Sequence, residues 1–166
     1  MLKAIKARRF RAGDGRFAIV ASQYNARYVD AMLEAAKEEL ERAGAGEVLV
    51  ARVPGAYEIP VVAARLARTS SPHATRDTQH APRLSAVICL GVILRGETVH
   101  AAHIGEAVSR ALMEIQVLHE VPVIHEVLLL ENEEQACARC LDPKRNRGRE
   151  AAQTALAMAQ VMAGLG

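Results

Sequence analysis

The fold is decided by residues 17–53, FAIVASQYNARYVDAMLEAAKEELERAGAGEVLVARV. The stretch opens with a short apolar run at residues 17–22, which is typical of a buried parallel strand. Residues 27–43 then place apolar side chains at helical spacing, and residues 47–53 indicate a second strand. Strand, helix and strand in this order predict a parallel pair joined by a right-handed crossover.

The rest of the chain continues this alternation. Pro60 begins a predicted helix that ends near residue 68, because proline is favoured in the first turn of a helix. The apolar spacing predicts further strands at residues 85–90 and within 121–130, and further helices at residues 100–119, 133–140 and 148–162. The sequence therefore predicts an α/β fold of the flavodoxin-like type, a three-layer α/β/α sandwich with a four-stranded parallel sheet.

The length of 166 residues fits one domain. We expect a basic N-terminal arm at residues 1–16 and a single domain at residues 17–166. Within that domain, residues 70–84 (SSPHATRDTQHAPRL) are rich in Ser, Thr, Pro and His and indicate a long surface loop. A loop of this length is either functional or disordered. We favour a disordered or surface excursion, because nothing in it resembles a ligand cluster.

Composition excludes several classes of protein. The net charge of +2 is too small to indicate binding to nucleic acid or to a membrane, and no apolar run approaches the length of a transmembrane helix. Cys137 and Cys140 are spaced C-x-x-C, but no second cysteine pair accompanies them, which argues against zinc. We expect a cytoplasmic protein with reduced thiols and without a zinc site.

Chemically interesting residues gather where predicted strands end. Ligands of parallel sheets bind at the carboxyl ends of the strands. Four segments fall there: residues 22–27, 54–58 and 91–100, and the residues from 125 onward. The sequence therefore predicts one site along this edge of the sheet.

The run Arg95-Gly96-Glu97-Thr98 leads from the third strand into a helix. Backbone N–H groups there, with the Thr98 hydroxyl, could hold a phosphate, and His100 could carry a proton. Blander interpretations stay open: Gly-x-Thr is often a turn with a helix cap, and a lone histidine is often a surface residue.

Other side chains add charge and aromatic rings to this edge. Arg139 and residues 144–147 carry positive charge, although such runs are usually solvated faces. Tyr24 and Tyr57 could stack on a flat ring, or could simply pack.

Five segments together resemble the lumazine synthase family, in order and in spacing. They are SQYN (22–25), VPGAYEIP (53–60), LGVILRGETVH (90–100), EQACAR (134–139) and NRGREAA (146–152). The resemblance covers nearly all of residues 17–162. It implies the condensation of 5-amino-6-(D-ribitylamino)uracil with 3,4-dihydroxy-2-butanone 4-phosphate in riboflavin biosynthesis, without a cofactor. It also implies a homopentamer with sites between neighbours, and in many members a 60-subunit icosahedral shell.

The resemblance also implies residue roles on the side of the pyrimidine substrate. One aromatic residue stacks on the ring, a neighbour belongs to the same loop, a second loop holds the ribityl chain, and a strand end meets the ring through backbone groups. These residues are, in that order, Tyr24; Asn25; Ala56, Tyr57 and Glu58; and Val92, Ile93 and Leu94.

For the phosphorylated substrate, the resemblance implies a turn formed by Glu97 and Thr98, with His100 as the catalytic histidine. Arg139 matches an arginine that binds the phosphate across a subunit boundary. Arg147 matches a substrate-binding position that is usually lysine.

The sequence departs from the family pattern before the Val of the fourth strand, where His125-Glu126 replaces a common Phe-Gly. This change places His125 beside the expected pyrimidine pocket and could alter how the ring is held. This departure and the long loop at residues 70–84 motivate one alternative to an active enzyme, a catalytically weakened shell or scaffold of the same fold. A second alternative, which rests on fold analogy alone, is a monomeric flavodoxin-like domain that binds a phosphorylated ligand.

Overall fold

The computed structural model describes residues 12, 15–73 and 83–165. Most of the expected N-terminal arm and the centre of the expected loop at 70–84 lie outside the described residues. Arg16, which we assigned to the arm, already belongs to the first strand. Within the described ranges, no helix is both long enough and apolar enough to cross a lipid bilayer.

Four strands form one sheet in the order β2-β1-β3-β4, and every pair is parallel. They are β1 (Arg16–Ser22), β2 (Glu47–Val53), β3 (Ala86–Leu94) and β4 (Val123–Leu130). Each connection along the chain carries a helix, which a parallel pair requires. The predicted fold class is confirmed.

The central strand β3 is longer than the predicted 85–90. Gly91 looked like a break, but it pairs with Val127, and the ladder continues to Leu94 opposite Leu130. A Cβ at Gly91 would lie 3.1 Å from Val127 Cγ1, so the glycine permits close packing within the strand. The extension carries Val92–Leu94 to the carboxyl edge of the sheet.

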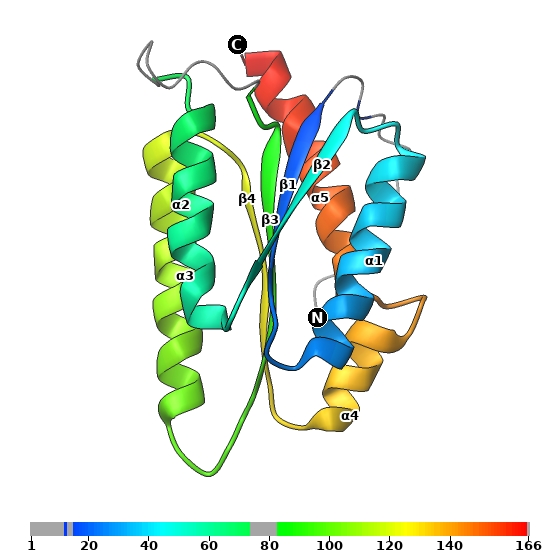
Figure 1. The fold of residues 1–166 in the computed structure, drawn as a ribbon, viewed down its shortest axis with the longest axis vertical. Coiled ribbons are helices and arrows are strands. Elements are labelled where there is room, and N and C mark those ends of the chain that lie inside the picture. Colours follow the sequence, from blue (N-terminus) through cyan, green and yellow to red (C-terminus); the bar gives the residue numbers. More distant parts are fainter. Residues whose placement is uncertain (1–11, 13–14, 74–82, 166) are drawn as a thin grey trace.

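Helices cover both faces of the sheet (Figure 1). On one face lie α2 (Ile59–Ser70), which follows the short 3-10 turn η1 (Ala56–Glu58), and α3 (His100–His119), whose bounds match the prediction. On the other face lie α1 (Ala26–Arg42), α4 (Glu133–Ala136), η3 (Cys137–Leu141) and α5 (Arg147–Leu165).

The predicted helix at 133–140 needs a correction. Its α-helical part ends at Ala136, and the chain continues as the wider π-type turn η3. The Asp142 N–H closes this turn by donating to the Cys137 carbonyl at 3.2 Å. The π turn places Arg139 on an exposed bend at the end of the short helix.

Alternate residues of each strand feed two separate cores. Phe17, Ile19 and Ala21 pack against α1 and α5, whereas Ala18 and Val20 pack against α2 and α3. The two-residue period of a strand explains this division. The layers are therefore closed by aliphatic side chains, as a sequence with 3% aromatic residues requires.

Candidate active site

The ends of β1 and β3 are joined by a side chain that we predicted at the site. Asn25 has a left-handed backbone with φ 56°, which asparagine tolerates better than most residues. In this conformation its Nδ2 donates a hydrogen bond to the Val92 carbonyl at 2.8 Å. Asn25 is thus fixed against the backbone stretch that the resemblance assigns to the pyrimidine.

The end of β2 joins the same edge through backbone contacts. The Tyr24 N–H donates to the Pro54 carbonyl at 3.0 Å, and the Gly55 N–H donates to Glu58 Oε2 at 2.9 Å. The second bond holds the Glu58 carboxylate over the start of η1. A glycine suits position 55, since a Cβ there would lie 2.9 Å from that carboxylate oxygen.

The two tyrosines are open to solvent. Tyr24 is 73% exposed and Tyr57 is 64% exposed, while Ala56 between the two loops is buried. Exposure of this size rules out a core-packing role within one chain. Both rings are available to a flat ligand at the carboxyl edge of the sheet.

The turn between β3 and α3 is anchored at its base. The Arg95 N–H donates to the Leu130 carbonyl at 2.8 Å, and its guanidinium pairs with Glu131 at 2.9 Å. Glu97, Thr98 and His100 beyond this anchor are exposed, whereas Ile93 and Leu94 before it are half-buried.

Thr98 is not the cap of α3. Val99 holds that position, and no side chain caps the helix. The first-turn N–H groups therefore lack a side-chain acceptor, as an anion site at a helix N-terminus requires.

The two arginines predicted for the substrate have opposite surroundings. Arg139 on η3 is exposed, and within the described residues its side chain makes no hydrogen bond or ion pair. Arg147 opens α5 and donates to Glu126 through Nε at 3.0 Å and Nη2 at 2.7 Å. Glu126 is only 7% exposed, and desolvation raises the pKa of its carboxyl, although the nearby charges of Arg147 and Arg139 oppose the rise.

His125 does not lie with the other predicted residues. It is the third residue of β4, opposite Cys89, and its side chain faces α3 rather than the carboxyl edge. Its Nε2 lies 2.8 Å from Ser109 Oγ, and its Nδ1 accepts from the Val127 N–H at 3.4 Å. Desolvation lowers the pKa of His125.

Family comparison agrees with this geometry. The sequence profile of the 6,7-dimethyl-8-ribityllumazine synthase family matches residues 14–163. The chain belongs to this family. The 6,7-dimethyl-8-ribityllumazine synthase of Xanthomonas oryzae pv. oryzae (strain PXO99A) is 40% identical over 149 residues, which cover 89% of each chain. That of Stenotrophomonas maltophilia (strain R551-3) is 39% identical over 149 residues, which cover 89% of this chain and 88% of the relative.

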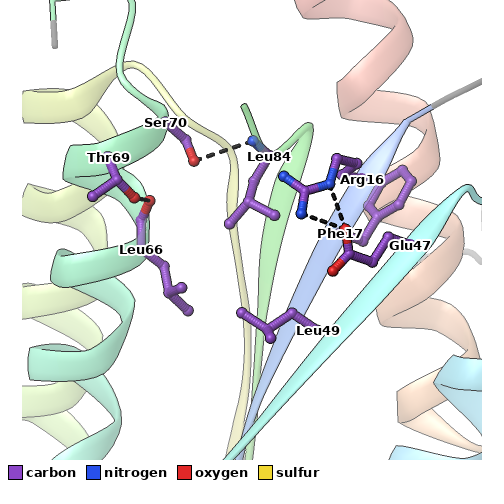
Figure 2. A pocket seen from close by; sticks show the side chains of 8 residues that line it. All are labelled: Arg16, Phe17, Glu47, Leu49, Leu66, Thr69, Ser70 and Leu84. Carbon is purple, nitrogen blue, oxygen red and sulfur yellow. Dashed lines mark hydrogen bonds and ion pairs between the residues drawn. The ribbon is translucent and has the colours of Figure 1, made fainter. Parts of the chain in front are cut away.

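Two hollows among the described residues lie away from the edge where the lumazine synthase motifs gather. One hollow, of about 100 Å³, lies at the amino ends of β1 and β2. Arg16 pairs with Glu47 at its wall (Figure 2). This hollow is smaller than the roughly 300–1,000 Å³ typical of ligand pockets. A second, open hollow lies on α3 between His103 and Glu114. Neither hollow is lined by a predicted site residue.

The sequence analysis missed two ion pairs next to the predicted site residues, Arg147 with Glu126 and Arg95 with Glu131. Glu126 was noticed only as a departure from the family pattern, and its contact with Arg147 was not foreseen. Glu131, which holds Arg95, was missed as well. The available signal was the parity of β4, where Glu126 falls on the opposite face to His125. No group of three or more potential metal ligands forms among the described residues.

Proposed function

We propose that this chain catalyses the lumazine synthase reaction, the condensation of 5-amino-6-(D-ribitylamino)uracil with 3,4-dihydroxy-2-butanone 4-phosphate in riboflavin biosynthesis. The observation that carries the proposal is the convergence of three family motifs at one sheet edge. Asn25 contacts Val92, and Tyr24 contacts Pro54, so the three strand ends form one surface. Family membership supplies the activity.

The pyrimidine substrate is assigned to the ends of β1, β2 and β3. Tyr24 offers a solvent-open ring for stacking. The backbone of residues 92–94, which continues past the end of the β1 ladder at Leu90, is assigned to hydrogen bonds with the uracil. Ala56, Tyr57 and Glu58 border this surface and are assigned to the ribityl chain. Holding both substrates side by side supplies much of the rate enhancement through proximity.

The phosphorylated substrate is assigned to the turn before α3. The Thr98 hydroxyl and the uncapped N–H groups of α3 can donate hydrogen bonds to the phosphate, with Glu97 in the same turn. His100 stands within this turn and can move protons as the amine attacks the ketone and the carbinolamine loses water to an imine. Loss of phosphate, ring closure and dehydration follow.

Arg139 is assigned to the site of a neighbouring copy, and we propose a homopentamer. Within one chain, only three of the 20 residues of α3 are buried, and Val117 and Leu118 are 68% and 71% exposed. Such a face suits contact with a second copy. A mass measurement in solution distinguishes a pentamer from a 60-subunit shell.

The proposed location is the cytoplasm, where the three free cysteines stay reduced.

The direct experiment follows lumazine absorbance after mixing the protein with both substrates, beside a protein-free mixture that measures the spontaneous reaction. Turnover clearly above the spontaneous rate is expected. We expect His100→Ala to lower kcat on the order of 10²-fold, since a positioned proton carrier is lost. The mass of the assembly, measured in parallel, should stay unchanged. A His100→Ala enzyme with the wild-type rate would remove His100 from the mechanism.

Arg139→Ala tests the phosphate assignment. Loss of a charge-assisted contact should raise the KM for the sugar phosphate by at least about tenfold and leave the KM for the pyrimidine nearly unchanged. Arg145→Ala is a matched control, because Arg145 is an exposed arginine whose ion pair with Asp142 is loose, at 3.8 Å. An unchanged KM for the sugar phosphate in Arg139→Ala would contradict the role.

A scaffold without activity is the second candidate. It is favoured by one observation, the pairing of the Arg147 guanidinium with both Glu126 and Glu150, which neutralises a predicted substrate-binding charge. The absorbance assay separates the two candidates. A rate equal to the spontaneous reaction, from a protein of pentameric or larger mass, is the outcome that favours the scaffold.

A further inference from the structure

The strongest unassigned feature is the clamp that holds Arg147. Glu126 accepts two parallel hydrogen bonds from this guanidinium, through Oε2 and Oε1. Glu150, three residues further along α5, accepts a third bond from Nη1 at 2.5 Å. Because β4 and the first turn of α5 hold the group from two sides, the guanidinium plane has a fixed orientation.

The clamp leaves part of Arg147 available to a ligand. A guanidinium has five N–H donors, and the three bonds to Glu126 and Glu150 occupy three of them. The two that remain are on the Nη atoms. The Arg147 side chain as a whole is 30% exposed, and no described residue uses these two donors.

The charge balance indicates what kind of ligand suits these donors. Two carboxylates face the single charge of Arg147, so the cluster of Glu126, Arg147 and Glu150 is net negative. A phosphate would be repelled by this surplus, whereas a neutral carbonyl oxygen would not. Arg139, exposed and without an ion pair in the described part of the chain, is the better partner for the phosphate.

We propose that Glu126 is a positioning residue that fixes Arg147 so that its two free N–H groups bind carbonyl oxygen of the pyrimidinedione substrate. The inference rests on the proposed function. It also explains why a carboxylate is tolerated at 7% exposure on β4, since the bidentate bond offsets its desolvation.

A purely structural clamp is the competing explanation, and the chain contains a matched control. Glu39 is 8% exposed, pairs with Arg42, and also contacts an arginine of α5, since Arg149 Nε lies 3.8 Å from its Oε2. Glu39 belongs to α1 and lies on no segment assigned to a substrate. Glu39→Gln and Glu126→Gln therefore both remove a buried, paired carboxylate, but only the second touches the proposed ligand contact.

The experiment measures KM and kcat for both substrates in the full-length assembly, together with the calorimetric Kd of the ribitylaminouracil alone. In Glu126→Gln we expect the KM and Kd for the pyrimidine to rise about tenfold, with kcat within about twofold and the KM for the sugar phosphate unchanged. Glu39→Gln should lower the melting temperature without changing either KM. Glu126→Asp keeps the charge but is one methylene shorter, so it holds the guanidinium less closely and should give a smaller rise of about threefold.

An unchanged Kd for the pyrimidine in folded Glu126→Gln would overturn the inference. If that variant does not fold, an unchanged Kd in Glu126→Asp overturns it equally. A rise confined to the sugar phosphate, or an equal rise in Glu39→Gln, also overturns it. A wild-type protein that binds the pyrimidine without turnover would refute the proposed function while the Kd comparison still decides the role of Glu126.

Discussion

The two helical layers of this lumazine synthase family member differ in how completely a single chain closes them. On one face, α1 buries eight of its 17 residues, and α5 packs beside it. On the other face, α3 buries three of its 20 residues and leaves Met113, Val117 and Leu118 exposed. One face of the sheet is therefore covered and packed within a single chain, whereas the helix on the other face presents an apolar surface suited to a neighbouring copy.

The closed face depends on close approach of two backbones. Gly148 in the first turn of α5 lies directly against the Met32 backbone of α1. Asn146 holds this approach, because its Nδ2 donates to the Ala31 carbonyl at 3.2 Å and its Oδ1 accepts from the Gly148 N–H at 2.9 Å. The crossing therefore tolerates no side chain at position 148.

The largest expected effect comes from Gly148→Ala, which would break the closed face. The new Cβ would overlap the Met32 carbonyl, so α5 must shift, and we expect a loss of more than about 3 kcal/mol in the free energy of unfolding. Gly164→Ala is the matched control in the same helix, since a Cβ there meets nothing within 4 Å. Denaturant unfolding measures both, and a Gly148→Ala protein as stable as wild type would contradict the packing argument.

Changes on the exposed face of α3, which we call the open face, should have a smaller effect on the free energy of unfolding but a large effect on assembly. The double change Val117→Glu and Leu118→Glu places charges on exposed positions of α3, so a single chain should lose less than about 1 kcal/mol. Light scattering should show a lower assembly mass. Val161→Glu, at a position on α5 that is 52% exposed, controls for added charge. An unchanged mass would show that the open face is not the contact.

The smallest expected effect is on the pH dependence of stability, and it arises from His125, which contacts Ser109 of α3. Burial lowers the pKa of His125 below its ordinary 6.5, so the folded chain binds this proton more weakly than the unfolded chain. The stability conferred by neutral His125 is present above pH 6.5 and is lost as the pH falls through its lowered pKa. Melting temperatures between pH 7.5 and 5 should therefore fall less in His125→Gln than in wild type, and equal slopes would contradict this assignment.

Much of the fold could be predicted because strand and helix periods are local properties of the sequence. The bounds of α3 were correct, and the parallel sheet followed from the alternation of elements. The extension of β3 through Gly91 was missed, because a glycine in isolation looks like a break and only its contact with Val127 shows the ladder. The π turn that carries Arg139 was missed for a similar reason, since its closing bond spans five residues of ordinary helix-forming sequence.

The sequence by itself determined the layered α/β architecture and the edge of the sheet where the family motifs collect, because hydrophobic spacing and chain chirality act over short distances. Only the tertiary structure decided which of the arginines at the predicted site are paired with carboxylates and which are left exposed. Arg147 and Arg139 carry the same charge in the sequence, yet the Arg147 guanidinium is held by Glu126 whereas Arg139 is exposed. That difference depends on residues 21 positions apart meeting across two elements, a contact that no local pattern encodes.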